Sequence, residues 1–429
     1  MKLQCTGARF CFSLGLLWFV TGCAPSTSPD HPNPGDTYPT PAEVLPDMMR
    51  GINIGNTLEP PDEGGWNNGP FQEYFFDDIR AAGFTTVRIP VRWDHHTDSG
   101  PPYTIHPDWL ARVAQIVDWG LSRDLFIILN AHHEWWFVDN YTDSLQWDRF
   151  QRIWEQIATT FQDRSDHLLF EIINEPHGMS REAVDELNRR ILAVIRQTNP
   201  YRIVIYSGND WSGPDALMNA AVPEDDYVLG YFHSYDPWPF AGEGQGVWGN
   251  DADLAVVDNR FREVENWSIS TGVPVMMSEF GAITSCDYNS RMLFYAAYVE
   301  AALRHHIAFQ AWDDGGLFAI YDRYHRTWSE VKDILLYTYP DGPTHLEVTA
   351  LPYYTAWLTW ENRSLEGGTL YVERARTTPD FTRIAQLPDT STYFLDTVAT
   401  ASNIRYYRVV FETNQGEVKM TPPVRIIGP

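Results

Sequence analysis

Eight short apolar runs alternate with helix-like segments over about 300 residues, and this alternation is the feature that most constrains the fold. Strands joined through helices run parallel, because each crossover returns the chain to the same end of the sheet. Eight such units predict a (β/α)₈ TIM barrel, an α/β fold, rather than a doubly wound open sheet, since no glycine-rich phosphate loop follows the first run. The runs span residues 52–54, 86–89, 126–129, 168–173, 203–206, 228–232, 275–277 and 308–311.

The texture of the sequence changes after residue 342, which we take as the end of a barrel domain covering residues 43–342. Short runs of alternating apolar and polar residues follow, separated by turn residues, as is typical of antiparallel strands. Residues 345–428 therefore predict a small all-β, immunoglobulin-like sandwich. Trp360 in an early run and Tyr407 in a late one give this segment a resemblance to a fibronectin type III module.

The N-terminus has the form of an export signal over residues 1–22, with Lys2 and Arg9 flanking an apolar stretch too short for a stable membrane span. The stretch ends in Val-Thr-Gly-Cys at 20–23, which resembles the bacterial lipobox, so we expect lipidation of Cys23. An ordinary secretory signal is the alternative. Residues 23–42 predict a flexible linker. We expect an exported lipoprotein of the outer membrane or cell surface, or otherwise a secreted protein.

Charge and composition exclude several classes of partner. The formal net charge of −26 argues against nucleic-acid binding and against attraction to anionic membranes, leaving a lipid anchor as the only expected membrane contact. The chain has 17 Trp, whose rings can stack on neutral sugars or fill a core. Beyond Cys5, Cys11 and Cys23, only Cys286 remains, so we expect no disulfide in the mature chain.

Polar side chains follow the predicted strands at their carboxyl ends, where barrels place their sites. Glu175 follows the fourth run in Asn-Glu-Pro, and Glu279 follows the seventh in Ser-Glu-Phe-Gly. Because an unpaired buried carboxylate costs several kcal/mol, two of them at one rim predict a catalytic pair of the kind that cleaves glycosidic bonds. The alternative is two structural carboxylates in salt bridges. The same rim should carry Asn56, Glu59, Arg88, His132, His133, Asn174, His233, Tyr235 and Trp312.

Five segments of the barrel resemble glycoside hydrolase family 5, a retaining family that contains many cellulases. The resemblance extends over residues 43 to about 340 and keeps the family's order. The segments are Gly-Asn-Thr-Leu-Glu at 55–59, Val-Arg-Ile-Pro-Val at 87–91, His-His-Glu at 132–134, Asn-Glu-Pro at 174–176 and Glu-Phe-Gly at 279–281.

The resemblance implies a role for each catalytic residue. Glu175 would be the general acid/base and Glu279 the nucleophile, with Arg88 and Tyr235 keeping Glu279 ionised. The negative charge of Glu279, with partial burial, would raise the pKa of Glu175. Asn174 would hydrogen-bond the 2-hydroxyl of the sugar.

The resemblance also implies the substrate-binding residues. His132 and His233 would orient the glutamates and the substrate, and His133 would support a neighbouring subsite. Trp312 would form the floor of the cleaved subsite, set by a cis peptide bond to Asp313. Asn56 and Glu59 would bind hydroxyls of a more distant sugar. Sugar-stacking platforms or hydrophobic plugs are expected from Trp66, Trp135, Trp136, Trp238 and Trp248.

These residues together predict a retaining endo-β-1,4-glucanase, a cellulase, acting on a β-linked polysaccharide. A β-mannanase or xyloglucanase of the same fold is the alternative substrate class, and a catalytically inactive carbohydrate-binding lipoprotein is the alternative class of protein. We expect no cofactor and no metal, because His132, His133, Glu134 and His233 lack a metal-binding spacing. We expect a monomer, in which the sandwich is a spacer or packing partner, with polysaccharide binding by the sandwich as the alternative. Close relatives commonly have asparagine at Asp314.

Overall fold

The computed structural model describes residues 38–397 and 404–428. The expected signal peptide, Cys23 and most of the expected linker lie outside the described residues. Within the described ranges, no helix combines the length and the apolar character needed to cross a membrane.

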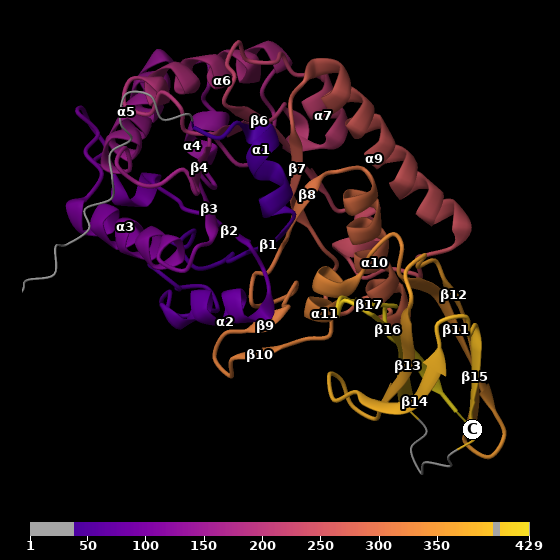
Figure 1. The fold of residues 1–429 in the computed structure, drawn as a ribbon. Coiled ribbons are helices and arrows are strands. Elements are labelled where there is room, and N and C mark those ends of the chain that lie inside the picture. The colour runs from indigo at the N-terminus through magenta and orange to yellow at the C-terminus, as the bar shows by residue number, and fades with distance from the viewer. Residues whose placement is uncertain (1–37, 398–403, 429) are drawn as a thin grey trace, which may run out of the picture. The chain divides into compact units, whose positions relative to one another are not determined.

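Eight parallel strands pair in chain order and close into a barrel (Figure 1). The barrel closes where β1 pairs with β8, with Ile52 beside Ala311. The predicted (β/α)₈ fold is therefore confirmed. The strands are β1 (Arg50–Asn53), β2 (Thr86–Ile89), β3 (Phe126–Asn130), β4 (Leu168–Glu171), β5 (Val204–Tyr206), β6 (Val228–Ser234), β7 (Val275–Phe280) and β8 (Ala308–Ala311).

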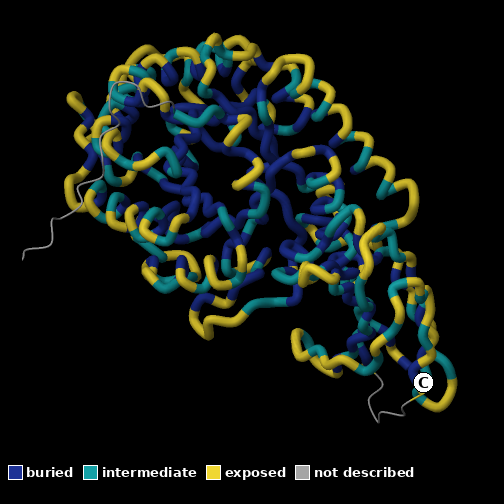
Figure 2. Tube along the Cα trace, viewed as in Figure 1, coloured by how far each residue is buried: buried dark blue, intermediate teal, exposed yellow. Residues whose placement is uncertain are grey.

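Helices surround the barrel and turn their exposed residues outward, while the strands inside are buried (Figure 2). Local signals set their ends: the Ser180 hydroxyl caps α6, and Gly272 ends α9 in the left-handed conformation that glycine adopts without strain. The main helices are α2 (Tyr74–Ala82), α3 (Pro107–Leu121), α5 (Ser144–Thr160), α6 (Arg181–Arg196), α7 (Pro214–Asn219), α9 (Asp251–Thr271), α10 (Tyr288–Arg304) and α11 (Val331–Tyr337).

Short elements complete the barrel domain. The N-terminal pieces α1 (Pro41–Val44) and η1 (Leu45–Met48) place Val44, Leu45 and Met48 in one apolar cluster with barrel residues such as Ile128 and Leu169. The barrel interior is thus filled with apolar side chains there, and the polar side chains gather at the carboxyl ends of the strands. The remaining short elements are η2 (Asp94–His96), α4 (Trp135–Val138), η3 (Asp210–Ser212), α8 (Trp238–Ala241), β9 (Tyr321–Asp322) and β10 (Thr327–Trp328).

The C-terminal module consists of two antiparallel sheets around a core that includes Trp360, Leu370 and Tyr407. One sheet has the order β11 (Pro343–Leu351), β12 (Thr355–Asn362), β15 (Tyr393–Asp396). The other has the order β14 (Thr382–Pro388), β13 (Gly368–Ala375), β16 (Ile404–Thr413), β17 (Val418–Met420), with β18 (Val424–Ile427) also pairing with β16. The predicted all-β module after the barrel is therefore confirmed.

Candidate active site

Arg88, at the carboxyl end of β2, is fully buried and joins two buried glutamates. Its Nε and Nη2 donate to the two oxygens of Glu171 at 2.7 and 2.6 Å, and its Nη1 donates to Glu279 Oε1 at 2.5 Å. Burial lowers the pKa of Arg88, but the charges of Glu171 and Glu279 raise it more, so the net shift is upward. Burying two carboxylates with one guanidinium costs desolvation free energy that their attraction does not reliably recover. The arrangement therefore indicates a functional role rather than a contribution to stability.

Glu171 is a member of this network that the sequence reading missed. It lies at the end of β4, and its Oε1 also accepts a hydrogen bond from Asn130 Nδ2 at 2.9 Å. Asn53 is a second such residue: its Oδ1 accepts from Arg88 Nη1 at 2.9 Å. One feature of the sequence could have indicated Glu171: it is a charged residue inside the otherwise apolar run at 168–173. A buried strand tolerates a charged residue only when the charge has a partner.

Glu279 lies in β7 with 6% of its side chain exposed. Its Oε1 is held by Arg88, and its Oε2 accepts a hydrogen bond from the Tyr235 hydroxyl at 2.9 Å. Burial, with a smaller contribution from the charge of Glu175, raises the pKa of Glu279, and the opposing effects of His233, Arg88 and Tyr235 reduce this rise without cancelling it. Both oxygens are oriented by donors, and these hydrogen bonds favour the ionised form of the carboxyl group against the effect of burial.

Glu175 lies just beyond β4, with 23% of its side chain exposed, so a substrate can reach it. Its backbone has a positive φ of 44°, and its amide donates to the Tyr231 hydroxyl at 3.2 Å, while that hydroxyl donates to the Ile173 carbonyl at 2.6 Å. Burial raises the pKa of Glu175 to about 7, against Arg88 and His177, and Glu171 adds to the rise. Burial, rather than the charge of Glu279, is therefore the largest cause of the raised pKa.

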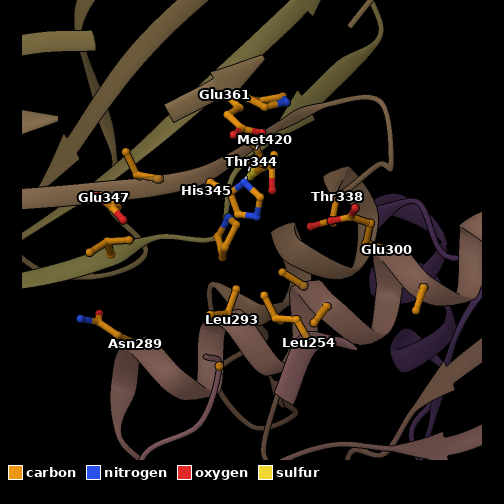
Figure 3. A pocket seen from close by; sticks show the side chains of 18 of the residues that line it. Leu254, Asn289, Leu293, Glu300, Thr338, Thr344, His345, Glu347, Glu361 and Met420 are labelled. Carbon is orange, nitrogen blue, oxygen red and sulfur yellow. Dashed lines mark ion pairs between the residues drawn. The ribbon is translucent and has the colours of Figure 1, made fainter. Parts of the chain in front are cut away.

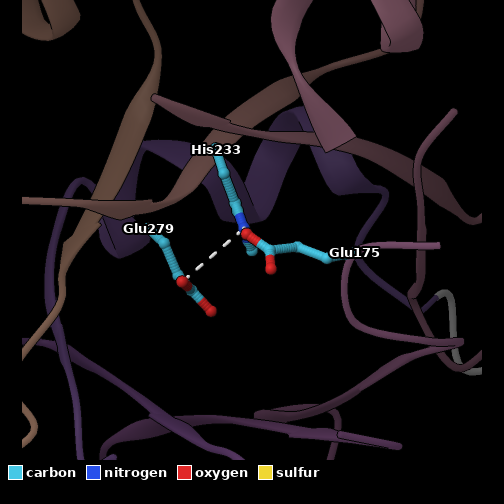
Figure 4. A group of neighbouring side chains, drawn as sticks. All are labelled: Glu175, His233 and Glu279. Atoms are coloured by element: carbon cyan, nitrogen blue, oxygen red, sulfur yellow. Dashed lines mark hydrogen bonds and ion pairs between the residues drawn. The ribbon is translucent and has the colours of Figure 1, made fainter. Parts of the chain in front are cut away.

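His233 connects the two glutamates (Figure 4). Its Nδ1 is 2.8 Å from Glu175 Oε1 and 3.6 Å from Glu279 Oε2, and its Nε2 hydrogen-bonds with Ser278 Oγ at 3.0 Å. Burial lowers the pKa of His233 to about 4, so the ring is neutral at neutral pH. One atom from each of Glu175, His233 and Glu279 lies within 4.8 Å of the others. Such a group is close enough to contact a single reacting centre.

The structure brings Asn174, His132 and Trp312 to the same rim. Asn174 Oδ1 accepts a hydrogen bond from Arg88 Nη2 at 2.8 Å. The amide nitrogen of Asn174 therefore points away from Arg88 and remains a donor for another group. The rings of His132 and Trp312 are nearly parallel, with centroids 6.0 Å apart. Gly55 is required beneath this indole, because a Cβ there would lie 2.6 Å from the Trp312 ring.

The peptide bond between Trp312 and Asp313 is not cis, so the expectation from the sequence was wrong at this position. Among the described residues the cis bonds precede proline: Pro101–Pro102, Asp236–Pro237 and Thr378–Pro379. The Trp312 amide instead donates to the Phe280 carbonyl of β7 at 2.9 Å, so pairing with the neighbouring strand positions this residue.

Glu59 is placed differently from the sequence expectation of a sugar-binding side chain. It is fully buried, and its two oxygens accept hydrogen bonds from the backbone amides of Asn56, Thr57 and Leu58 at 2.7 to 3.0 Å. Burial raises its pKa to about 7. Its carboxyl group therefore holds the loop after β1, and Asn56, at a positive φ of 56°, remains the half-buried member of that loop.

Two further rim residues hold local structure. Asp314 Oδ1 accepts from the amides of Gly316 and Phe318 at 2.7 and 2.9 Å, so its carboxylate shapes the loop after β8. His133 has a positive φ of 57°, and burial lowers its pKa to about 4. Its ring lies beside Trp135 and Trp66, with centroids 4.8 and 5.8 Å away.

The loop tryptophans fall into two groups. Trp66, Trp135 and Trp238 are about half exposed and available for stacking on a sugar, whereas Trp248 is buried against Phe240. Trp136 is partly buried under Arg149. Trp211 is a further exposed candidate that the sequence reading missed, and its ring lies parallel to His177 at 3.8 Å.

A closed barrel with two carboxyl groups and a buried arginine at the carboxyl ends of its strands defines a glycoside hydrolase. The chain belongs to the cellulase family, glycosyl hydrolase family 5, whose family model matches residues 48–315.

The relatives of this chain include several endoglucanases. Endoglucanase H of Acetivibrio thermocellus is 42% identical over 330 residues, which cover 75% of this chain and 36% of that protein. Endoglucanase A of Ruminococcus albus is 30% identical, covering 67% of this chain and 88% of that protein. The chain thus spans about a third of the length of the Acetivibrio relative and most of the Ruminococcus one.

Solved structures show the same similarity in space. A tri-modular family 5, subfamily 4 endo-β-1,4-glucanase from Bacillus licheniformis, complexed with cellotetraose, has a TM-score of 0.76 and 30% identity. The match covers 91% of this chain and 79% of the Bacillus licheniformis chain. Thermotoga maritima Cel5A, complexed with mannotriose, has a TM-score of 0.65 and 32% identity, covering 68% and 97%.

Proposed function

We propose that this protein is a retaining endo-β-1,4-glucanase. The observation that carries the proposal is the proximity of the two catalytic carboxyl groups: one oxygen of Glu175 and one of Glu279 lie within 4.8 Å of each other. Retaining glycosidases place their carboxyl groups about 5–5.5 Å apart, whereas inverting enzymes need about 6.5–9.5 Å to admit a water molecule between them.

In the first step, a carboxylate oxygen of Glu279 attacks the anomeric carbon while the bond from that carbon to the glycosidic oxygen breaks. Glu175, protonated near neutral pH because its pKa is about 7, donates its proton to the leaving oxygen. The products are a glycosyl ester on Glu279 and the released half of the chain. Asn174, held by Arg88, offers its amide nitrogen to the sugar 2-hydroxyl.

In the second step, Glu175 removes a proton from water, whose oxygen attacks the anomeric carbon and displaces Glu279. Esterification has removed the negative charge of Glu279, which favours the ionised form of Glu175 at this stage. The sugar is released with the configuration it had in the substrate, and both carboxyl groups return to their starting states.

The substrate proposed is a β-1,4-glucan, supported by the endoglucanase names of the relatives and by the cellotetraose complex of a structural neighbour. A mannan is the second candidate, because Thermotoga maritima Cel5A was solved with mannotriose. The buried network of Arg88, Glu171 and Glu279 argues against an inactive carbohydrate-binding protein. Desolvating these charges is costly, and binding a neutral sugar does not require it.

Reducing-sugar release from carboxymethyl-cellulose, barley β-glucan, xyloglucan and glucomannan tests the proposal, with Glu279→Gln as the matched blank. We expect activity on the two glucans that falls by at least about 10³-fold in the variant. Activity confined to glucomannan or xyloglucan would move the substrate class. Equal sugar release by both proteins would contradict the enzymatic function.

We also propose that the protein is an exported lipoprotein carrying its lipid on Cys23, that it acts as a monomer, and that its C-terminal module is fibronectin type III-like. The division into a three-stranded and a five-stranded antiparallel sheet supports the last point. Substituting Cys23 by Ala should release the protein from the membrane fraction of its host. Retention of the variant in that fraction would contradict the anchor.

A further inference from the structure

The two outer faces of the sandwich differ in chemistry. On the sheet containing β13 and β16, charged side chains pair with one another and with the barrel: Arg408 binds Glu373 and Asp333, each at 2.7 Å. The guanidinium carbon of Arg383 lies 3.8 Å from the ring centroid of Tyr371. This face is therefore occupied by its own ion pairs and by a contact to α11.

The sheet β11–β12–β15 presents aromatic rings and hydroxyl groups instead. Its inward side chains include Leu358 and Phe394, and its register pairs Trp357 with Leu395 and Thr359 with Tyr393. Because side chains alternate along a strand, these four residues share the outer side. We call this surface the aromatic face; its residues are Trp357, Tyr393 and Leu395, with Thr349, Thr355 and Thr359.

The two rings of the aromatic face are stacked and open to solvent. Their centroids are 5.2 Å apart with 25° between the planes, and the two residues are 37% and 60% exposed. Across residues 38–397 and 404–428, the ring contacts of Trp357 and Tyr393 are with each other, and no Arg or Lys lies over either ring. Exposed apolar groups gathered in this way are a feature of binding surfaces rather than of folding.

The charge of the aromatic face selects the kind of ligand. Its strand positions from 355 to 359 and from 393 to 395 carry no cation, so an anionic polymer would find no ion pair there. A sugar has apolar C–H faces that stack on aromatic rings and hydroxyl groups that hydrogen-bond with threonine. A neutral, hydroxyl-rich chain therefore matches both kinds of side chain on this face.

The face also continues toward the barrel. Glu361 lies four residues beyond Trp357 on the same side of β12, which corresponds to about 13 Å. Glu361 and Glu347 line a hollow of about 780 Å³ between this sheet and the barrel helices α9 and α10 (Figure 3). The aromatic face therefore adjoins a hollow whose opposite wall is formed by α9 and α10.

We propose that the aromatic face binds a β-linked glucan chain and keeps the enzyme on its polymer. The choice of glucan rests on the proposed function of the barrel. The inference goes beyond that function because it assigns a second carbohydrate site, remote from Glu175 and Glu279. Trp357 and Tyr393 supply the stacking surface, and the threonines supply hydroxyl partners.

Binding of the whole chain to insoluble cellulose tests the inference. All proteins carry Glu279→Gln, so that hydrolysis does not release them. We expect the Trp357→Ala, Tyr393→Ala double variant to bind about tenfold more weakly than its parent. Trp357→Tyr, which keeps a ring, should bind nearly as well. Tyr201→Ala is the matched control, because Tyr201 is an exposed aromatic outside the sandwich and should not change binding.

The same proteins with Glu279 intact separate this inference from the proposed function. Hydrolysis of soluble carboxymethyl-cellulose by the double variant should stay within about twofold of wild type, since the cleft is unchanged. No hydrolysis by wild type would contradict the proposed function and leave the binding assay readable. Unchanged retention of the double variant on cellulose would overturn the aromatic face as a glucan site.

Sedimentation of the same variants tests the other occupant, a second copy of this chain. A concentration-dependent dimer that the double variant loses would overturn the inference in favour of a self-interface. Thermal unfolding verifies that each variant is folded. Should the double variant fail to fold, Tyr393→Thr removes the more exposed ring alone, and the same two results decide.

Discussion

Charged side chains are buried at the catalytic rim of the barrel but largely exposed on the outer surface of the sandwich. At the rim, Arg88, Glu171 and Glu279 are buried together, with the Arg88 side chain 0% exposed. On the sandwich, Arg383 pairs with Glu412 while 46% of its side chain remains exposed. Burying charges is expensive and surface pairs contribute little, so the first arrangement indicates chemistry and the second indicates solubility.

Removing the central cation of each network should give the largest difference. Arg88→Met leaves Glu171 and Glu279 buried without their partner, and we expect the free energy of unfolding to fall by about 3–5 kcal/mol. Arg383→Met, the matched surface change, should cost about 0–1 kcal/mol. Urea unfolding followed by tryptophan fluorescence measures both. Equal losses in the two variants would contradict the comparison.

The pH dependence of catalysis should report the buried rim. Because the pKa of Glu175 is about 7, its acid form is lost above that pH, and kcat/KM on soluble glucan should then fall about tenfold per pH unit. Below that region, protonation of Glu279 removes the nucleophile, so the profile should be bell-shaped. A rate that stays flat from pH 7 to pH 9 would exclude Glu175 as the general acid.

Glu171 should influence that profile without touching the substrate. Its negative charge helps to raise the pKa of Glu175, so Glu171→Gln should move the basic limb to lower pH. We expect kcat/KM at pH 8, relative to its own optimum, to drop by about threefold or more compared with wild type.

The matched control is Glu186→Gln, which removes a carboxylate from a surface pair with Arg189 and Arg190. Its profile should coincide with that of wild type. A loss of activity in Glu171→Gln without any shift of the limb would indicate a structural role alone.

The smallest expected effect concerns the partner of His233. Ser278→Ala removes the hydroxyl that hydrogen-bonds with His233 Nε2 at 3.0 Å, leaving a buried ring nitrogen unpaired. We expect a loss of about 1 kcal/mol in the free energy of unfolding and a severalfold lower kcat. Ser278→Thr, which keeps the hydroxyl, should retain more activity than the alanine variant. Identical kinetics for the two variants would show that the hydroxyl does not position His233.

The sequence predicted the barrel well because its signals are local: each of the eight apolar runs became a strand of the closed barrel. The sequence also indicated which side chains meet at one rim, because the carboxyl ends of the strands lie together in a barrel. The structure brings together Glu175, Glu279, Arg88, Tyr235 and His233. Glu171 was missed because its significance depends on a partner 83 positions away, Arg88.

Other features depended on contacts that no local pattern contains. Glu59 belongs to a recognisable segment, but three nearby backbone amides occupy its carboxylate. The stacking of Trp357 on Tyr393 required the register of β12 and β15, which brings residues far apart in sequence side by side. Neither arrangement follows from residue type or spacing alone.

The stereochemistry of hydrolysis tests the central claim most directly, namely that Glu175 and Glu279 act as a retaining pair. Proton NMR of freshly cleaved cellotetraose shows which anomer appears before mutarotation mixes the two forms. The separation of the carboxyl groups, with one oxygen of each within 4.8 Å, predicts the β-anomer first. Initial release of the α-anomer would contradict the account.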